Sequence, residues 1–345
     1  MSFAAKETEE RIRTICLGIR EVYESYRKNN RWVNYQDAWG LVIFLAAISA
    51  IVTSFVFWWN GMLPAWITIL SIAFFTSFLH ELEHDLIHEL YFKKIPLIYH
   101  AMLFGVWIFR PLTLNPWIRK YWHHFHHQHS GSLVDIEERG VTNGEKWGLL
   151  RLIILPDLLL GFLFRFPRLK KEISKEFKEG RMQPTAMKML KKTILLGMMP
   201  FGIPLHLVWY VFVLLKVMQF LGINLYPNLQ EIFFQVSTPL MVGLIAPNLI
   251  RQFCLHFITS NMHYFGDIEH GNVLEQTQVL NAWWTLPFHL FCFNFGSTHA
   301  IHHFVVNEPF YLRQLTAKRA LDILKNNGIR FNDYGSFRRA NRYHS

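Results

Sequence analysis

The stretch YWHHFHHQHS, residues 121–130, places five histidines within seven positions. A neutral imidazole is the commonest metal ligand among protein side chains, so this density predicts metal binding. The spacing His123-x-x-His126-His127 is more informative than the number, because residues three apart face the same way on a helix. The adjacent histidine points about a quarter-turn away. One such segment can therefore supply ligands to two neighbouring metal ions.

The same spacing returns far along the chain, at His299-x-x-His302-His303. A chance repeat of so uncommon a triplet is not expected in a chain of this length. We therefore expect the fold to bring the two triplets together around one metal centre.

A third histidine group precedes both triplets. His80, His84 and His88 follow one another at intervals of four and so share one stripe of a helix. At 1.5 Å per residue, His84 and His88 would lie about 6 Å apart along the helix axis. That separation suits two ligands of one metal ion or a bridge between two.

The composition is that of a membrane protein with a substantial polar part. Apolar residues make up 51% of the chain and charged residues 17%, against roughly 25% charged residues in a typical soluble protein. The three cysteines form no CxxC pair, which argues against a disulfide framework and a thiolate metal site. The net charge of +10 would suit nucleic acid, but the basic residues gather in particular loops, as membrane topology requires.

Long apolar runs predict an all-α integral membrane protein with four transmembrane helices. A bilayer core of about 30 Å needs about 20 helical residues to cross. The predicted spans are at about 38–59, 63–85, 193–220 and 231–255, and shorter apolar stretches at 97–109, 148–164 and 279–295 are expected to be re-entrant or interfacial. The histidines would then lie in a helical cap that carries a dimetal site.

The distribution of Lys and Arg predicts the orientation of the chain. Residues 1–35 hold seven, residues 91–192 hold eighteen and residues 251–345 hold nine, whereas the loops at 60–62 and 222–230 hold none. By the positive-inside rule, both termini and the long central loop are cytoplasmic. Every histidine cluster then falls on the cytoplasmic side, because the second and fourth spans run inward and end at His80 and His256.

Three parts of the chain are distinguished. In residues 1–35, apolar residues recur at spacings of three and four. This pattern predicts a cytoplasmic amphipathic helix that lies on the membrane or on the body of the protein. Those apolar residues are Ile12, Ile15, Ile19, Val22 and Tyr26. Residues 36–310 are expected to form the membrane domain, and residues 311–345 a cytoplasmic helix and tail.

The histidine groups resemble the three histidine boxes of the membrane-bound fatty acid desaturase-like superfamily, whose members are non-haem diiron enzymes. The matching segments are His84-Asp-x-x-His88, His123-x-x-His126-His127 and His299-x-x-His302-His303, and His263 resembles the additional histidine before the third box. The resemblance covers residues 36–310 and extends to the four spans and the cytoplasmic metal cap. The superfamily includes desaturases, hydroxylases, alkane monooxygenases and terminal-alkene-forming fatty acid decarboxylases.

The resemblance implies two iron ions held by nine histidines, with O₂ as co-substrate. The implied ligands are His84, His88, His123, His126, His127, His263, His299, His302 and His303. It implies C–H abstraction from a fatty acid or fatty acyl chain, with desaturation favoured over hydroxylation and over oxidative decarboxylation to a terminal alkene. The chain carries no haem or iron–sulfur motif, so a separate electron donor of the ferredoxin, rubredoxin or cytochrome type is expected. The compact length suits a bacterial inner-membrane enzyme.

Other residues beside the boxes leave part of the site open. The first ligand pair is either His84 and His88, which we favour, or His80 and His84. Candidate additional ligands, or hydrogen-bond partners of ligands, are His80, His124, His129, His256, Glu81, Asp85, Asp135, Glu137, Asp267 and Glu269. Metal-bound histidines usually donate their second N–H to a carboxylate or a carbonyl, although an ordinary ion pair is the simpler role for each carboxylate.

A function of another class fits part of the same sequence. His80-Glu81-x-x-His84 has the spacing of a zinc metalloprotease helix, with Glu81 as the general base. This alternative uses two histidines and leaves both His-x-x-His-His triplets unexplained. We therefore favour the dimetal oxidoreductase, and metal analysis separates the two functions.

The sequence says less about substrate and partners. Basic residues at 165–192, including Arg165 and Lys171, could attract a carboxylate, CoA or acyl-carrier head group, or anionic lipid. A positive cytoplasmic face would also favour an acidic electron donor. No feature of the sequence indicates chain length or regiochemistry.

Overall fold

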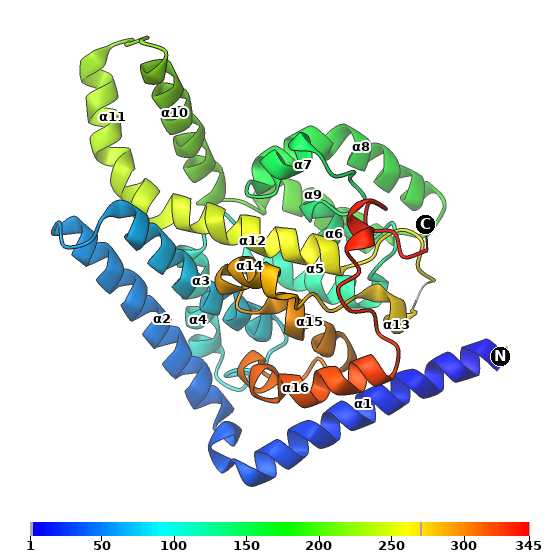
Figure 1. Ribbon diagram of the computed structural model, residues 1–345. Helices are drawn as coiled ribbons and strands as arrows, with labels where there is room; N and C mark the ends of the chain where they lie inside the picture. Colours follow the sequence, from blue (N-terminus) through cyan, green and yellow to red (C-terminus); the bar gives the residue numbers. More distant parts are fainter. Residues whose placement is uncertain (1–2, 270, 345) are drawn as a thin grey trace.

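The computed structural model describes residues 3–269 and 271–344. Within these residues the regular secondary structure is helical, and β pairing is limited to the isolated bridges His263–Thr277 and Val279–Phe331. The predicted all-α class is confirmed. In Figure 1 the helices form a body from which the α10–α11 hairpin projects.

Four helical segments are long and apolar enough to cross a bilayer, which confirms the predicted number. They are α2 (Gln36–Trp59), α3 (Ala65–Ile87), α10 (Gly202–Phe220) and the continuous stretch Pro227–Met262, which comprises α11 (Pro227–Leu240), the π-helical turn η2 (Met241–Ile245) and α12 (Ala246–Met262). All backbone hydrogen bonds of a helix are internal, which is what a hydrocarbon environment demands.

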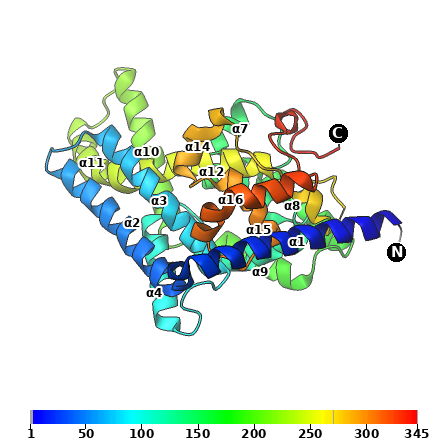
Figure 2. The same ribbon diagram turned by 60° about the horizontal axis from the view of Figure 1, so that its bottom comes forward.

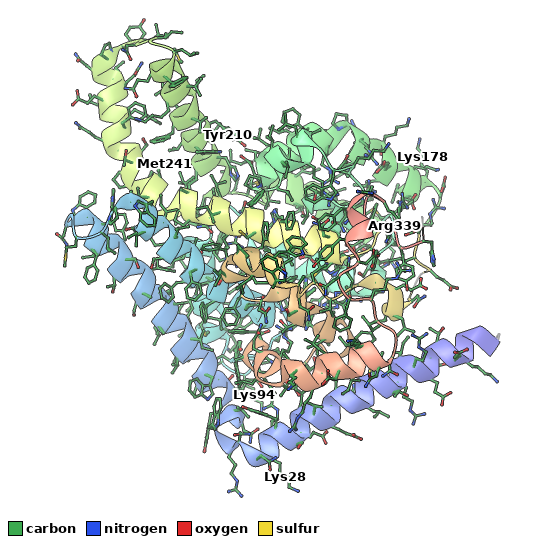
Figure 3. The ribbon with its side chains drawn as sticks, viewed as in Figure 1. Lys28, Lys94, Lys178, Tyr210, Met241 and Arg339 are labelled. Carbon is green, nitrogen blue, oxygen red and sulfur yellow. The ribbon has the colours of Figure 1, made fainter. Side chains whose placement is uncertain are left out.

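The third and fourth of these segments differ in extent from the spans expected from hydropathy. Residues 184–196 form a separate helix, α9 (Pro184–Leu196), and α10 begins only at Gly202. Pro239 and Pro247 flank the π-helical turn of the fourth segment. Each proline lacks a backbone N–H, and a wider turn accommodates the missing hydrogen bonds. Figure 3 labels Met241 at this turn, at the base of the α10–α11 hairpin.

The membrane-crossing helices expose apolar side chains outward and enclose polar ones at one end. Only 6% of the apolar window of α10 is buried inside the protein, and large residues such as Leu45, Val52 and Phe220 are exposed. This surface would be unfavourable in water but suits hydrocarbon. In α3, by contrast, every residue from Leu79 to Ile87 is buried, so the polar end of this helix lies inside the protein.

Shorter helices surround the ends of α3 and α12 (Figure 1). They are α4 (Pro96–Phe109), α5 (Pro116–His129), α6 (Ile136–Val141), α7 (Leu149–Ile154), α8 (Leu158–Lys178), α13 (Val273–Gln276), α14 (Leu286–Phe291), α15 (Phe295–Phe304) and α16 (Phe310–Asn326), with the short 3₁₀ turns η1 (Arg31–Asn34), η3 (Trp283–Thr285) and η4 (Tyr334–Phe337). The apolar stretch 97–109 lies in α4, which packs on α2 and α3, and the stretch 279–295 includes α14, which packs on α3 and α12.

The N-terminal amphipathic helix packs on the body of the protein. This helix, α1 (Phe3–Asn29), runs beside α16, as Figure 2 shows. Ile15, Ile19 and Tyr23 are buried, and the thiol of Cys16 donates to the carbonyl of Phe304 at the end of α15. The apolar stripe of α1 is therefore covered by protein at these positions.

A close approach between α2 and the loop after α3 gives a test of this packing. A Cβ atom on Gly40 would lie 2.5 Å from the Tyr91 ring, and Tyr91 is buried with its hydroxyl donating to Asp85 (2.8 Å). We expect Gly40→Ala to lower the thermal midpoint of the purified protein by a few degrees, because overpacking costs about 1–3 kcal/mol.

The matched control is Gly140→Ala in α6. A Cβ atom there would meet no described atom within 4 Å, so the midpoint should stay the same or rise slightly with helix propensity. Equal midpoints for the two variants would contradict the packing of α2 against Tyr91.

Candidate metal centre

Nine histidines from four separate segments converge at the buried end of α3. His84 and His88 come from the end of α3, His263 follows α12, and the two His-x-x-His-His triplets lie on α5 and α15. They form a five-histidine group, His84, His88, His123, His127 and His302, and a four-histidine group, His126, His263, His299 and His303. Within each group the ligand atoms all lie within 4.8 Å of one another.

Each triplet contributes to both groups. On α5, His123 and His127 belong to the five-histidine group and His126 to the other; on α15, His302 belongs to the first, and its neighbour His303 to the second. The groups adjoin, since the rings of His127 and His303 have centroids 5.3 Å apart. The adjacent histidines of a triplet point to different groups because successive helical residues are rotated by about a quarter-turn.

The helix that carries the first triplet, α5, and the short helix α6 after it have capped starts. Pro116 occupies the first turn of α5, where its missing N–H costs nothing, and the Asn115 side chain accepts from the backbone N–H of Trp117 (3.0 Å). The Asp135 side chain caps α6 in the same way by accepting from Glu138 N–H (3.4 Å). The α5 cap fixes where its helical periodicity begins, and therefore which face each histidine of the first triplet occupies.

The ring nitrogens meet at separations that suit a shared metal ion. In the five-histidine group, Nε2 of His88 lies 3.0 Å from Nε2 of His123 and 3.0 Å from Nε2 of His302. In the four-histidine group, Nε2 of His303 lies 3.2 Å from His263 and 3.3 Å from His299. Two nitrogens bound about 2.1 Å from one ion are about 3.0 Å apart in octahedral and about 3.4 Å apart in tetrahedral geometry.

Two carboxylates and one backbone carbonyl accept hydrogen bonds from the Nδ1 atoms of three of these rings. Nδ1 of His123 donates to Glu137 (2.9 Å), and Nδ1 of His126 donates to Asp135 (2.8 Å). Nδ1 of His263 donates to the Thr259 carbonyl (2.9 Å). Because an ionised carboxylate or a carbonyl only accepts, Nδ1 carries a proton in each of these rings, and in neutral His123 and His263 the Nε2 lone pair faces the group.

Burial keeps most of the rings uncharged. It lowers the pKa of His88, His123, His127, His263, His299, His302 and His303, to about 3 in the case of His263. These imidazoles are therefore neutral and able to act as ligands at pH 7. Burial also disfavours the charged form of His126, but the Asp135 carboxylate outweighs this effect and raises the pKa of His126 to about 9. A metal ion bound there would displace that proton.

The residues present fit a pair of metal ions. Neither ring nitrogen of buried His84 has a hydrogen-bond partner among the described residues. A buried polar atom without a partner is costly, and a metal ion would supply that partner. Nine nitrogens exceed one tetrahedral zinc site but suit two ions with four or five protein ligands each.

The other predicted histidines lie outside both groups. His80 accepts at Nδ1 from Arg110 (3.0 Å), and His256 donates from Nδ1 to the Leu155 carbonyl (2.7 Å). His129 donates from Nδ1 to the Phe125 carbonyl (3.0 Å). His124 is exposed, with its ring centroid 5.4 Å from that of His88. The structure therefore groups His88, and not His80, with His84.

The predicted carboxylates divide between the metal centre and other roles. Asp135 and Glu137 contact group histidines as described above. Glu81 is 3.3 Å from Arg313, and Asp85 is 3.2 Å from the same guanidinium. Asp267 accepts from the backbone N–H groups of Tyr343 and His344 near the C-terminus. Asp85 is 3.8 Å from Nδ1 of His84, beyond hydrogen-bonding distance.

Sequence reasoning missed the role of Glu138. Its carboxylate accepts from the Thr259 hydroxyl (3.3 Å) and lies 3.4 Å from Nδ1 of His263. The acidic run from Asp135 to Glu138 soon after the first triplet was a signal, but adjacent acids do not reveal which one faces the site. Sequence reasoning also missed Glu83, which is buried and bonds to both Arg110 and Arg119, because its partners are distant in the chain.

A conservative change at Asp135 tests its role at the metal centre. Asp135→Asn should lower the affinity for the bound transition metal about 10- to 100-fold, because the amide no longer fixes and polarises the His126 ring. The measurement is metal retained per chain against a competing chelator, by elemental analysis.

Asp267→Asn is the matched control for this change. The same substitution there touches only the C-terminal backbone, so metal retention should equal that of the unaltered protein. Equal retention by both variants would show that Asp135 does not orient a ligand.

Comparison with known proteins bears on the same residues. The sequence model described as fatty acid desaturase matches residues 60–335, which include all nine grouped histidines. A search of curated protein sequences finds no match. The family match covers most of the chain and agrees with the resemblance of its histidine segments. The chain therefore belongs to the fatty acid desaturase family.

Proposed function

We propose that this membrane oxidoreductase of fatty acids uses two iron ions and O₂ to introduce a double bond into a fatty acid or fatty acyl chain. The observation that supports the proposal most is the convergence of nine imidazoles in two adjoining groups. Family membership supports the lipid substrate. We assign the nine histidines as the iron ligands, with five for one ion and four for the other.

Iron is proposed because the donor set and the reaction both require such a metal. Imidazole suits iron, copper and zinc, whereas magnesium and calcium prefer oxygen ligands. When bound, the iron pair supplies the redox chemistry with O₂ that hydrogen abstraction from an unactivated CH₂ needs, which redox-inert zinc does not provide. Desaturation removes two hydrogen atoms from adjacent carbons and, with O₂, two electrons and two protons, yields two molecules of water.

The side chains of the protein prepare the site for this chemistry. The neutral rings present their Nε2 lone pairs inward, and Asp135, Glu137 and the Thr259 carbonyl fix the tautomers of the rings they contact. Burial of the groups excludes bulk water, which limits side reactions. The chain thus holds the ligands, orients them and shields the reacting carbons.

The zinc metalloprotease alternative, which uses His80-Glu81-x-x-His84, is not supported by the contacts of α3. His80, which a zinc protease would need as a ligand, accepts from Arg110, and Glu81, its general base, lies against Arg313. His84 is grouped with His88, His123, His127 and His302 instead. An oxidoreductase accounts for all of these contacts together.

We further propose that the metal centre and both termini face the cytoplasm and that electrons come from a separate acidic protein. The Lys and Arg counts support this orientation. Lys170, Lys171, Lys175 and Lys178 are exposed on α8, where Figure 3 labels Lys178. Arg165, by contrast, is buried and pairs with Glu145 (3.1 Å), so it does not belong to this basic surface.

The reaction is tested by metal analysis and product analysis together. The iron-loaded chain, expressed in a membrane with a reductase and ferredoxin, should retain about two irons per chain and yield unsaturated fatty acids by mass spectrometry. A hydroxylated product or a terminal alkene one carbon shorter would assign the same site to hydroxylation or oxidative decarboxylation. One zinc per chain without a lipid product would refute the proposal.

A ligand substitution tests the assignment of the site. His302→Ala should lower the iron content from about two to about one or less per chain and abolish the product, because His302 contacts both His88 and His127. The protein should still insert into the membrane. His124→Ala, at an exposed histidine outside both groups, is the control and should keep iron and product. Undiminished turnover in His302→Ala would rule the assignment out.

A further inference from the structure

Arg251 is a buried arginine without a partner. It lies on α12, its exposed fraction is 0%, and none of its three guanidinium nitrogens has a hydrogen-bond partner among the described residues. Arginine stays protonated in proteins. A buried, unpaired positive charge is strongly unfavourable, so its presence calls for an anion that binds there.

The other buried arginines show what a partnered guanidinium looks like in this protein. Arg110 bonds to Glu83 and His80, and Arg313 bonds to Glu81 and Asp85. Arg151 and Arg165 each bond to backbone carbonyls and to at least one side chain. Each of these four guanidinium groups therefore has at least one partner, although Nε of Arg110, Arg151 and Arg313 has none among the described residues; Arg251 differs because none of its three nitrogens has a partner there.

The charges around Arg251 leave an excess of positive charge. Arg110, Arg119 and the carboxylate of Glu83 act on Arg251 electrostatically. Both oxygens of Glu83 are already taken, one by Arg110 and the other by Arg119. Arg119 also lies 3.4 Å from Glu137, so three guanidinium groups share two carboxylates. Neither carboxylate bonds to Arg251 among the described residues, and the region would favour one more anion.

This region adjoins the metal centre. Helix α12 packs against α3, and Arg251 acts electrostatically on His80, which lies one helical turn before His84. Because His80 accepts at Nδ1 from Arg110, the proton of the neutral ring is on Nε2, which also has no partner among the described residues. Arg251 and His80 are therefore two buried donors near the five-histidine group that have no acceptor among the described residues.

The surroundings restrict the anion to a small one with an apolar body. Arg251 lies within a membrane-crossing segment, and a CoA or a carrier protein is too large and too polar to reach a fully enclosed guanidinium there. A carboxylate matches the planar fork of arginine and forms paired hydrogen bonds with it. A fatty acid brings both the carboxylate and an alkyl chain that the bilayer supplies.

We propose that Arg251 binds the carboxylate of a free fatty acid, so that the substrate of the metal centre is the free acid and not its thioester. This inference rests on the proposed function, because that function supplies the fatty acid. It adds Arg251 as a residue that determines specificity through the head group of the substrate.

Binding to the full-length, iron-loaded chain in nanodiscs tests the proposal. Tritiated dodecanoic acid is the probe, and unlabelled dodecanoic acid, methyl dodecanoate and dodecanoyl-CoA are the competitors, without O₂ or reductant. The acid should compete about 10- to 100-fold better than the ester, because a hydrogen bond to a charged group is lost in the ester. Arg251→Gln should remove this preference, and Arg168→Gln on the exposed part of α8 should keep it.

Several outcomes would overturn the proposal. Equal competition by the ester or by the CoA thioester would show that the carboxylate is not recognised. A preference for the acid that survives in Arg251→Gln would place recognition elsewhere. Equal competition by acetate, phosphate or chloride would indicate a site for small anions that does not need an alkyl chain.

Thermal stability distinguishes a binding role from a structural one. Arg251→Met removes an unpaired charge, so the midpoint without fatty acid should stay the same or rise, while the stabilisation by dodecanoic acid should disappear. Arg313→Met is the control, and it should lower the midpoint because it leaves Glu81 and Asp85 unpaired. A lowered midpoint for Arg251→Met with retained stabilisation by the acid would show a structural role.

The design separates failure of this inference from failure of the proposed function. Binding is measured without turnover, so it does not depend on which reaction follows. A chain that binds the acid through Arg251 but forms no oxidised product would refute the reaction alone. A chain that forms the product but does not depend on Arg251 for binding would refute this inference alone.

Discussion

The structure depends on the mutual approach of imidazole nitrogens from four separate segments of the chain. Nε2 atoms of different rings lie 3.0–3.3 Å apart, while the Nδ1 protons of His123 and His126 are directed away, to Glu137 and Asp135. With its proton on Nδ1, His123 offers a lone pair at Nε2, which can accept a hydrogen bond from a neighbouring ring or bind a cation, and a shared cation can hold several such rings at once. Metal binding and assembly of the four histidine segments are therefore expected to be one event, because no single segment carries a complete set of ligands.

The membrane determines how those segments reach one another. A chain inside hydrocarbon must be helical to satisfy its backbone, so α3 and α12 arrive at the metal centre as long, continuous helices. Both end where the histidines begin: His88 follows α3 and His263 follows α12. The helices α5 and α15 close the site from the other sides, and α1 covers α16 behind them. The rigid crossing helices thus set the positions that the shorter helices complete.

Buried ion pairs tie the shorter helices to the membrane-crossing ones. Arg313 on α16 bonds to Glu81 and Asp85 on α3, and Glu83 on the same helix bonds to Arg110 and Arg119. A buried pair gives little net stability over an apolar contact, but loss of one partner is costly, so such pairs favour a single arrangement. Arg251 differs from them because no described residue offers it an acceptor, and that difference is what suggests a substrate carboxylate.

Local spacing alone was enough to identify much of this protein. Hydropathy gave the four crossing helices, and the triplets at His123 and His299 predicted two adjoining ligand groups, because helix geometry fixes the direction of each residue from its neighbours. Tertiary structure decided what spacing cannot express. It grouped His84 with His88 and gave His80 to Arg110. It also placed Asp135 on His126 while Asp267 caps the C-terminal backbone, and it left Arg251 buried and unpaired. The contacts of His80 with Arg110 and of Asp267 with Tyr343 join residues far apart in the chain. Such contacts, like the burial of Arg251, depend on how whole helices pack and not on any local repeat.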